Sequence, residues 1–386
     1  MSATPALKKL LAETFLEAAQ ALETGRVGRR LRVGLTILGS EHGPDEVIRG
    51  GLLAQQNNPD LEVVFIGPDL PANLKQVATS PCVDEGHQQM EKLLDQGELD
   101  AAVTMHYNFP IGVATVGRVV TPGQGREMFL ATTTGTTATQ RVEAMVYNAL
   151  HGIAVAKAFG IENPAVGILN VDGARQVERI LNQLRQQGYG LTFAATIRAD
   201  GGSVMRGNDL LAGTPDVMVC DTLTGNLLMK VFSAYTTGGS FEATGYGYGP
   251  GVGPGYKRII NIISRASGAP VIANSIAYAA KVAQGGLLQL MAQEWEAAQR
   301  AGLNKLVQSL QQAPESKEVE PPPAKAVTEE IAGIDVLEIE NAARILWQAG
   351  IYAETGMGCT GPVILVAAED FAAAQKLLQE RNYISN

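Results

Sequence analysis

The chain has 386 residues, of which 46% are hydrophobic and 18% are charged. This length exceeds one ordinary domain, so two domains, or one domain with an appendage, are expected. The formal net charge of −9 argues against a nucleic-acid partner, because binding to phosphates requires clustered Lys and Arg. The chain lacks a run of about 18 apolar residues, which argues against a membrane span.

The first 30 residues predict an amphipathic helix rather than a targeting segment. Glu13, Glu17 and Glu23 interrupt its apolar positions at helical spacing, and the apolar core of a signal peptide is missing. The three cysteines are an odd number without metal-ligand spacing, which argues against a disulfide framework. A cytoplasmic, reducing compartment is therefore expected.

Apolar strands and helices alternate through residues 31–312. Near-continuous runs of Val, Ile and Leu predict buried strands at 31–38, 61–67, 100–105, 165–171, 216–221 and 270–274. Helical periodicity is found at 46–56, 141–160, 174–190 and 289–312. This alternation predicts an α/β fold with a doubly wound, mostly parallel sheet, in which ligands bind at the carboxyl ends of the strands.

The composition changes abruptly at residues 313–330, which are charged, lack aromatic residues and contain three consecutive prolines. Such a segment predicts a linker that is semi-rigid in its polyproline part. Residues 331–386 then predict a small C-terminal α/β module, with helices at 338–350 and 369–382 and a strand at 362–367.

The sequence ETGMGCTGP in this module places Cys359 between Gly358 and Thr360. Three glycines within six residues allow a sharp turn that exposes backbone N–H groups. Such a turn could stabilise a nucleophilic thiolate, with an oxyanion held at Gly358 and Gly361 and a hydrogen bond from Thr360 to the sulfur. The alternative is a small buried residue in a glycine-rich turn, since neighbouring residues supply no base.

Two loops are candidates for phosphate binding. Residues 132–141 precede a long helix and offer hydroxyl and N–H groups at its positive end, through Thr134, Gly135, Thr136 and Arg141. An ordinary threonine-capped helix start would explain the same pattern. Residues 245–258 are glycine-rich and are expected to open a helix, with Lys257 and Arg258 in its first turn, where an anion would be favourable. Neither loop matches a nucleotide-binding fingerprint.

Polar residues at expected strand ends are further candidates. The turn after strand 216–221 would project Asp221, Thr224 and Asn226 into a crevice, whereas Cys220 itself is expected in the core. His106 follows strand 100–105 and is a candidate for lining the site. His151 lies in the middle of a helix and Cys82 in a turn, and neither is expected to act in the site.

Residues 31–290 resemble the phosphate acyltransferases of bacterial phospholipid synthesis, which move an acyl group from a carrier-protein thioester to phosphate. The similar stretches are GSEHGPDEVIRGGLLAQQNNPDLEVVFIG, HGIAVAKAFGIENPAVGILNV, GNDLLAGTPDVMVCDTLTGN and SGAPVIANS. The whole chain, including GMGCTGP, more closely resembles the alpha subunit of component C of the glycine, sarcosine and betaine reductase complex. Leu35 and Thr36, in place of the acyltransferases' opening acidic residue, and the cysteine-bearing tail favour the reductase family.

The resemblance implies an isocitrate-dehydrogenase-like fold and a role for Cys359 as the carrier of an acetyl thioester. The acetyl group would come from a carboxymethyl selenoprotein, component A, and phosphate would then accept it to give acetyl phosphate. The resemblance also implies a partner beta subunit and an oligomeric assembly, and it indicates neither an organic cofactor nor a metal. The proline-rich linker suggests that the module moves between the carrier and a phosphate crevice.

Other functions remain open. A phospholipid-type acyltransferase would have a sizeable apolar groove and would act without Cys359. A non-catalytic scaffolding subunit would leave the assembled complex active after Cys359→Ala. A nicotinamide dehydrogenase is disfavoured, because the first strand–helix turn, GSEHGPDE, lacks the glycine fingerprint.

Overall fold

The structure is a computed structural model that describes residue 15 and residues 30–198, 201–311, 319–336, 338–358, 361–381 and 383–384. The helix expected at 1–30 therefore lies almost wholly outside the described residues, as do Cys359 and Thr360. In the part of the chain that is described, no helix is long and apolar enough to cross a membrane.

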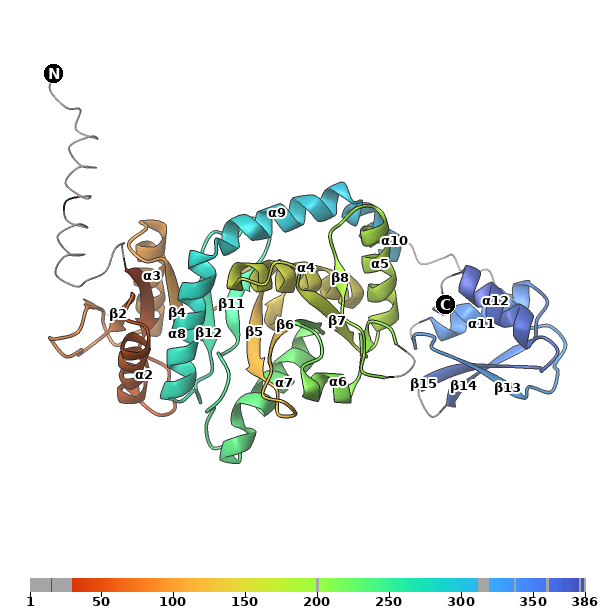
Figure 1. The fold of residues 1–386 in the computed structure, drawn as a ribbon, viewed down its shortest axis with the longest axis horizontal. Helices are drawn as coiled ribbons and strands as arrows, with labels where there is room; N and C mark the ends of the chain where they lie inside the picture. Colours follow the sequence, from red (N-terminus) through yellow and green to blue (C-terminus); the bar gives the residue numbers. More distant parts are fainter. Residues whose placement is uncertain are drawn as a thin grey trace, which may run out of the picture.

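A large sheet forms the centre of the body, residues 30–311, and confirms the α/β class (Figure 1). Its described strands are β1 (Leu31–Thr36), β2 (Leu61–Gly67), β3 (Gln76–Ala78), β4 (Ala101–Met105), β5 (Val113–Val120), β6 (Glu127–Thr136), β7 (Ala165–Leu169), β8 (Thr192–Phe193), β9 (Val204–Met205), β10 (Val217–Val219), β11 (Gly249–Val252) and β12 (Ile260–Ile263). Their order is β3-β2-β1-β4-β12-β11-β5-β6-β10-β7-β8, and β9 pairs with β7.

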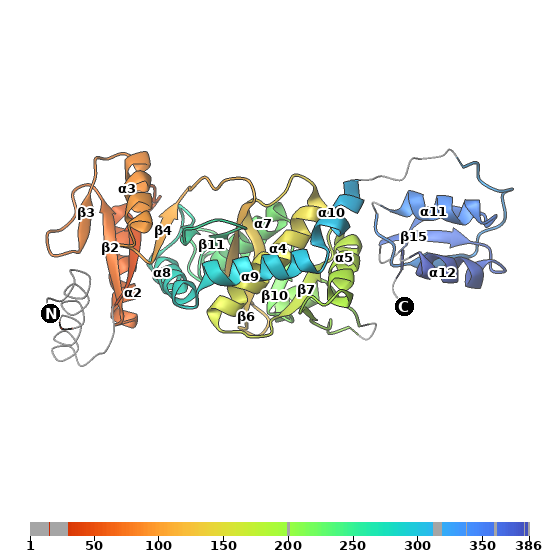
Figure 2. The ribbon, with the colours of Figure 1, turned by 90° about the horizontal axis from the view of Figure 1, so that it is seen from above.

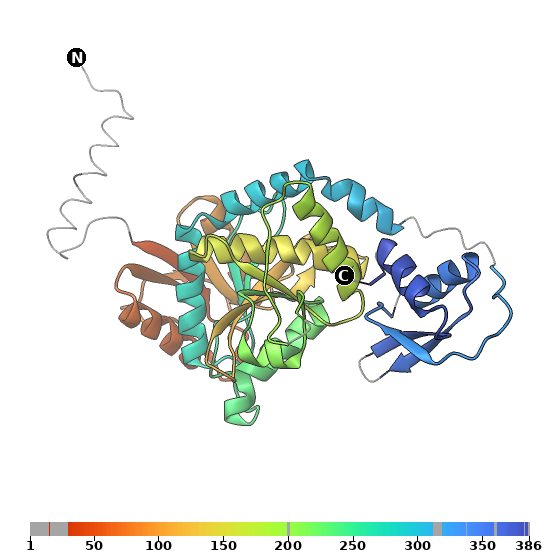
Figure 3. The same ribbon diagram turned by 45° about the vertical axis from the view of Figure 1, so that its right-hand side comes forward.

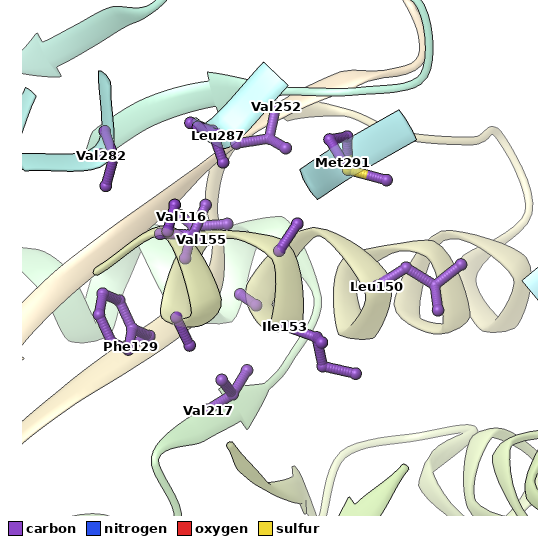
Figure 4. Close-up of a cluster of buried hydrophobic side chains, with 14 of the residues drawn as sticks. Val116, Phe129, Leu150, Ile153, Val155, Val217, Val252, Val282, Leu287 and Met291 are labelled. Atoms are coloured by element: carbon purple, nitrogen blue, oxygen red, sulfur yellow. The ribbon is translucent and has the colours of Figure 1, made fainter. Parts of the chain in front are cut away.

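Helices cover both faces of this sheet. They are α2 (Pro44–Asn57), α3 (Val83–Asp95), α4 (Arg141–Phe159), α5 (Ala174–Gln186), α6 (Gly207–Ala212), α7 (Thr222–Ala234), α8 (Ala269–Gln284), α9 (Leu287–Arg300) and α10 (Leu303–Gln311). Alternate residues of β6 belong to different cores. Phe129 belongs to the same buried cluster as Leu150 and Ile153 of α4 (Figure 4), whereas Leu130 belongs to a second cluster with Met229 of α7. Adjacent strand residues therefore face helices on opposite sides of the sheet, which confirms the doubly wound arrangement.

Two antiparallel strands, β11 and β5, separate the parallel halves of the sheet. β11 runs antiparallel to β12 and to β5, and β5 runs antiparallel to β6. On one side β1, β4 and β12 are parallel, and on the other β6, β10 and β7 are parallel. The carboxyl ends of these two groups therefore lie at opposite edges of the sheet.

Three sequence expectations differ from the structure. Residues 270–274, expected as a strand, begin α8, where Pro270 is tolerated because the first helical residues need no N–H partner. A short apolar run cannot distinguish a buried helix face from a strand. Residues 132–136 extend β6 rather than forming a loop, and residues 245–258 contain β11 and lead into β12 without a helix.

The C-terminal module has its own sheet and core. Its described elements are β13 (Glu329–Ala332), α11 (Ile339–Gln348), β14 (Ala353–Gly358), β15 (Gly361–Val366) and α12 (Phe371–Glu380). The strands pair antiparallel in the order β13-β15-β14, so the last two residues of the expected linker belong to the module. Figures 2 and 3 show the module beside the end of the body that carries α5 and α10.

Candidate phosphate site

A cavity of about 360 Å³ lies at the carboxyl end of β6, between the first turns of α4 and α7. Its lining is uncharged and consists mainly of hydroxyl-bearing and small residues: Thr134, Gly135, Thr136, Thr137, Ala138, Ala144, Thr222, Leu223 and Asn226. The cavity therefore combines hydrogen-bonding groups with a few small apolar surfaces.

Gly225 allows α7 to pack directly on β6 beside this cavity. A Cβ atom at Gly225 would lie 1.8 Å from the carbonyl oxygen of Thr132, so a larger residue cannot be accommodated without movement. Two contacts fasten the same turn to the strand. Asn226 Nδ2 donates to the Thr133 carbonyl at 2.9 Å, and the hydroxyls of Thr222 and Thr132 are 3.1 Å apart. The first turn of α7 is thereby fixed as one wall of the cavity.

Gly135 shapes the opposite wall. Its φ of +88° is in the left-handed region, and a Cβ atom there would approach the Val113 carbonyl oxygen to 2.5 Å. Glycine meets both requirements, because it lacks the Cβ that makes this conformation costly. The end of β6 can therefore turn from the sheet toward α4 at this point.

The positive ends of two helices meet at the cavity. Gln140 caps α4 by accepting the Glu143 N–H at 2.6 Å, and Asp221 caps α7 by accepting the Thr224 N–H at 3.1 Å. The N–H groups in a first helical turn lack partners within the helix, and the helix dipole adds a partial positive charge there. Arg141 lies in the first turn of α4, where its guanidinium is paired with two carboxylates. This combination of donors and charge suits a small anion such as phosphate.

The cavity brings together candidates from two segments about 90 residues apart, the end of β6 and the start of α7. Thr134, Gly135, Thr136 and Asn226 line it directly. Sequence reasoning missed Thr222 and Leu223, although both lie in the turn singled out after the expected strand 216–221.

Arg141, Asp221 and Thr224 lie in or next to the helix caps rather than among the cavity-lining residues. The guanidinium of Arg141 is 3.5 Å from the carboxylates of both Asp172 and Asp221. The Asp221 carboxylate also accepts the Thr224 hydroxyl at 2.6 Å. Asp221 and Thr224 are therefore engaged in holding the start of α7, and Arg141 links three strand–helix junctions at this edge.

His106 lies far from the cavity, contrary to expectation. It is exposed at the carboxyl end of β4, with β12, β11 and β5 between that strand and β6. The reversal of strand direction also places the end of β4 at the opposite edge of the sheet.

Lys257 and Arg258 precede β12 instead of opening a helix. The guanidinium of Arg258 makes two hydrogen bonds of 2.8 Å to Asp95 and lies 3.0 Å from Glu91. The carboxylates of α3 therefore neutralise the charge of Arg258. Two strands, β11 and β5, separate this segment from β6, so neither cation lines the cavity.

The two described cysteines are not positioned as nucleophiles at this site. Cys220 is fully buried, its sulfur lies 3.8 Å from the Thr132 carbonyl oxygen, and burial raises the pKa of its thiol. This confirms the expected core role of Cys220. Cys82 is exposed at the start of α3.

Cys359 joins β14 to β15 in the chain and lies outside the described residues. The strands that flank it pair in register up to Gly358 opposite Gly361. The roles expected for Thr360 and for the backbone of Gly358 and Gly361 remain predictions.

A family model shows the class of protein to which the chain belongs. A family model described as a fatty acid synthesis protein matches residues 31–365. The phosphate acyltransferase of Thermotoga maritima is 28% identical over 233 residues, which cover 52% of this chain and 68% of that protein. A crystal structure of a branched-chain phosphotransacylase from Enterococcus faecalis covers 65% of this chain and 99% of its own, with 15% identity and a TM-score of 0.47.

A further relative matches almost end to end. The glycine/sarcosine/betaine reductase complex component C subunit alpha of Peptoclostridium acidaminophilum is 54% identical over 385 residues, covering 98% of this chain and 99% of the relative. The chain therefore belongs to the fatty acid synthesis protein family and, within it, to the family of these component C alpha subunits.

Proposed function

We propose that this chain is the acyl-transfer subunit of a glycine, sarcosine or betaine reductase complex and releases acetyl phosphate. Cys359 carries the acetyl group as a thioester, and phosphate binds in the cavity between α4 and α7. The selenoprotein carrier of the complex delivers the two-carbon unit, and the complex supplies the reducing step. A beta subunit completes component C.

The observation that carries this proposal is the cavity itself. Two helix starts and a threonine-rich strand end surround a space suited to a small anion. The small lining residues Ala138 and Ala144 leave room for a short acyl group. The family relationship supports the same chemistry, because relatives are named as phosphate acyltransferases and as component C alpha subunits.

The transfer step is an exchange at one carbonyl carbon. An oxygen of bound phosphate attacks the thioester carbon of acetyl-Cys359, so a C–O bond forms and the C–S bond breaks. The products are acetyl phosphate and the Cys359 thiolate, which can accept the next acetyl group. N–H groups of the glycine-rich turn would stabilise the oxyanion of the intermediate.

Mass spectrometry of the purified protein tests the covalent step in the reverse direction. Incubation with acetyl phosphate should add one acetyl group, about 42 Da, to Cys359, and excess phosphate should remove it. Cys359→Ala should remain unlabelled, whereas Cys82→Ala, which changes the exposed cysteine, should be labelled as fully as the parent protein. An active complex containing the Cys359→Ala chain would instead support direct transfer or a scaffolding role.

A further inference from the structure

Arg179 connects the body to the C-terminal module. Its guanidinium pairs with both carboxylate oxygens of Glu338, with one Nη1–Oε1 distance of 3.3 Å. The same guanidinium lies 6.0 Å from the centre of the Tyr383 ring. A bidentate pair restricts orientation as well as distance, so Arg179 positions the module as well as attracting it.

The contact joins separate parts of the module to one helix of the body. Glu338 directly precedes α11, and Tyr383 follows α12 and packs on the module core. Arg179 belongs to the second turn of α5, and its neighbours Ile180 and Leu181 are buried in the body. Two parts of the module therefore contact one arginine, which projects from a helix that is packed on the body.

The location of this contact relates the module to the cavity. α5 follows β7, whose carboxyl end lies at the same edge of the sheet as that of β6, with β10 between them. The ion pair of Arg141 with Asp172 joins the start of α4 to the segment that precedes α5. The module thus docks on a helix that begins at the same edge of the sheet as the cavity.

The same contact can be released without unfolding either part. The side chains of Arg179 and Glu338 are 26% and 15% exposed, so water reaches the pair at its edge. The body and the module have separate hydrophobic cores. Lys325 bonds to Glu369 and Asp370 of the module, so the described segment that leads into β13 belongs to the module side.

We propose that Arg179, Glu338 and Tyr383 form a releasable docking site that holds the module against α5 during the phosphate step and frees it to meet the carrier. The assignment of these two steps rests on the proposed function. The existence of the docked state does not.

Small-angle X-ray scattering tests the docking site independently of activity. Arg179→Glu and Glu338→Arg should each increase the radius of gyration, and the double variant should restore it, because the pair is then re-formed with reversed charges. Arg185→Glu is the matched control, since Arg185 lies on the same helix and stacks on Phe193 of the body. Parent-like scattering of Arg179→Glu, or a double variant that stays expanded, would overturn the docking site.

Separate measurement of the two half-reactions tests its role in transfer. Arg179→Glu should slow phosphate-dependent loss of acetyl from Cys359 at least tenfold while leaving acetylation by the carrier within about twofold. Equal slowing of both half-reactions, or of neither, would contradict the positioning role. If Cys359 is never acetylated, the proposed function fails while the scattering result still decides whether the docking site exists.

Discussion

At the scale of single residues, the site depends on positions where only glycine fits. Gly225 brings α7 onto β6, and Gly135 turns the strand end toward α4. His151 of α4 is a different kind of position, because a polar ring is fully buried there. Its two ring nitrogens have no hydrogen-bond partner among the described residues. Both kinds of position make measurable predictions.

Gly225→Ala should destabilise the protein by about 2 kcal/mol or more, because the added methyl group would overlap the Thr132 carbonyl oxygen. Gly86→Ala is the matched control. Gly86 is also the fourth residue of its helix, α3, and a Cβ atom there would meet no atom within 4 Å. That change should gain up to about 1 kcal/mol from helix propensity. Urea unfolding would measure both, and equal effects would contradict the packing argument.

His151 should make the protein sensitive to mild acid. Burial lowers the pKa of His151 from 6.5 to about 3, so below pH 6.5 the unfolded chain binds a proton that the folded protein does not. Stability is therefore lost as the pH falls through this range, by up to about 1.4 kcal/mol per pH unit. His151→Met should remove this part of the slope between pH 8 and pH 5 in urea unfolding.

At the scale of elements, the candidate site is the meeting point of two helix starts and one strand end. The first turns of α4 and α7 provide the positive potential, and the end of β6 provides hydroxyl groups. These contributions come from segments that are distant in the chain. A charge placed in the first turn of α7 should therefore act on phosphate directly.

Leu223→Asp should raise the KM for phosphate at least tenfold, because a carboxylate in the cavity repels the anion by about 1–4 kcal/mol. Leu223 is 79% exposed and lies in the first turn of α7, where an acidic residue favours the helix. Leu227→Asp is the control, since Leu227 is 63% exposed on the same helix but does not line the cavity. Steady-state kinetics with varied phosphate would compare the two variants. Equal KM values would contradict phosphate binding in this cavity.

At the scale of the whole molecule, the chain consists of a body and a module with separate cores. Leu150 belongs to the core of the body, and Leu346 belongs to the core of the module. The contact at Arg179 is small compared with either core, so little packing energy links the two parts. Each part should therefore unfold largely on its own.

Leu346→Ala should speed hydrogen exchange in α11 and β15 while leaving α4 and β6 unchanged. Leu150→Ala should have the converse effect. Both leucines are fully buried, so each truncation should cost about 2–5 kcal/mol in its own part. Mass spectrometry of exchanged peptides would follow both. Faster exchange throughout the chain in either variant would mean that the two parts unfold as one unit.

The sequence alone was sufficient for the α/β class, because long apolar runs and helical periodicity report burial, which is a local property of each segment. It also identified Thr134, in an expected loop before a helix, and Asn226, after an expected strand, as candidate polar groups. It could not show that both line one cavity, or that the reversal at β5 and β11 sends His106 to the other edge of the sheet. Strand order and direction depend on which distant segments pair, and the likewise distant partners of Arg258 and Arg179 appear only when the chain is folded.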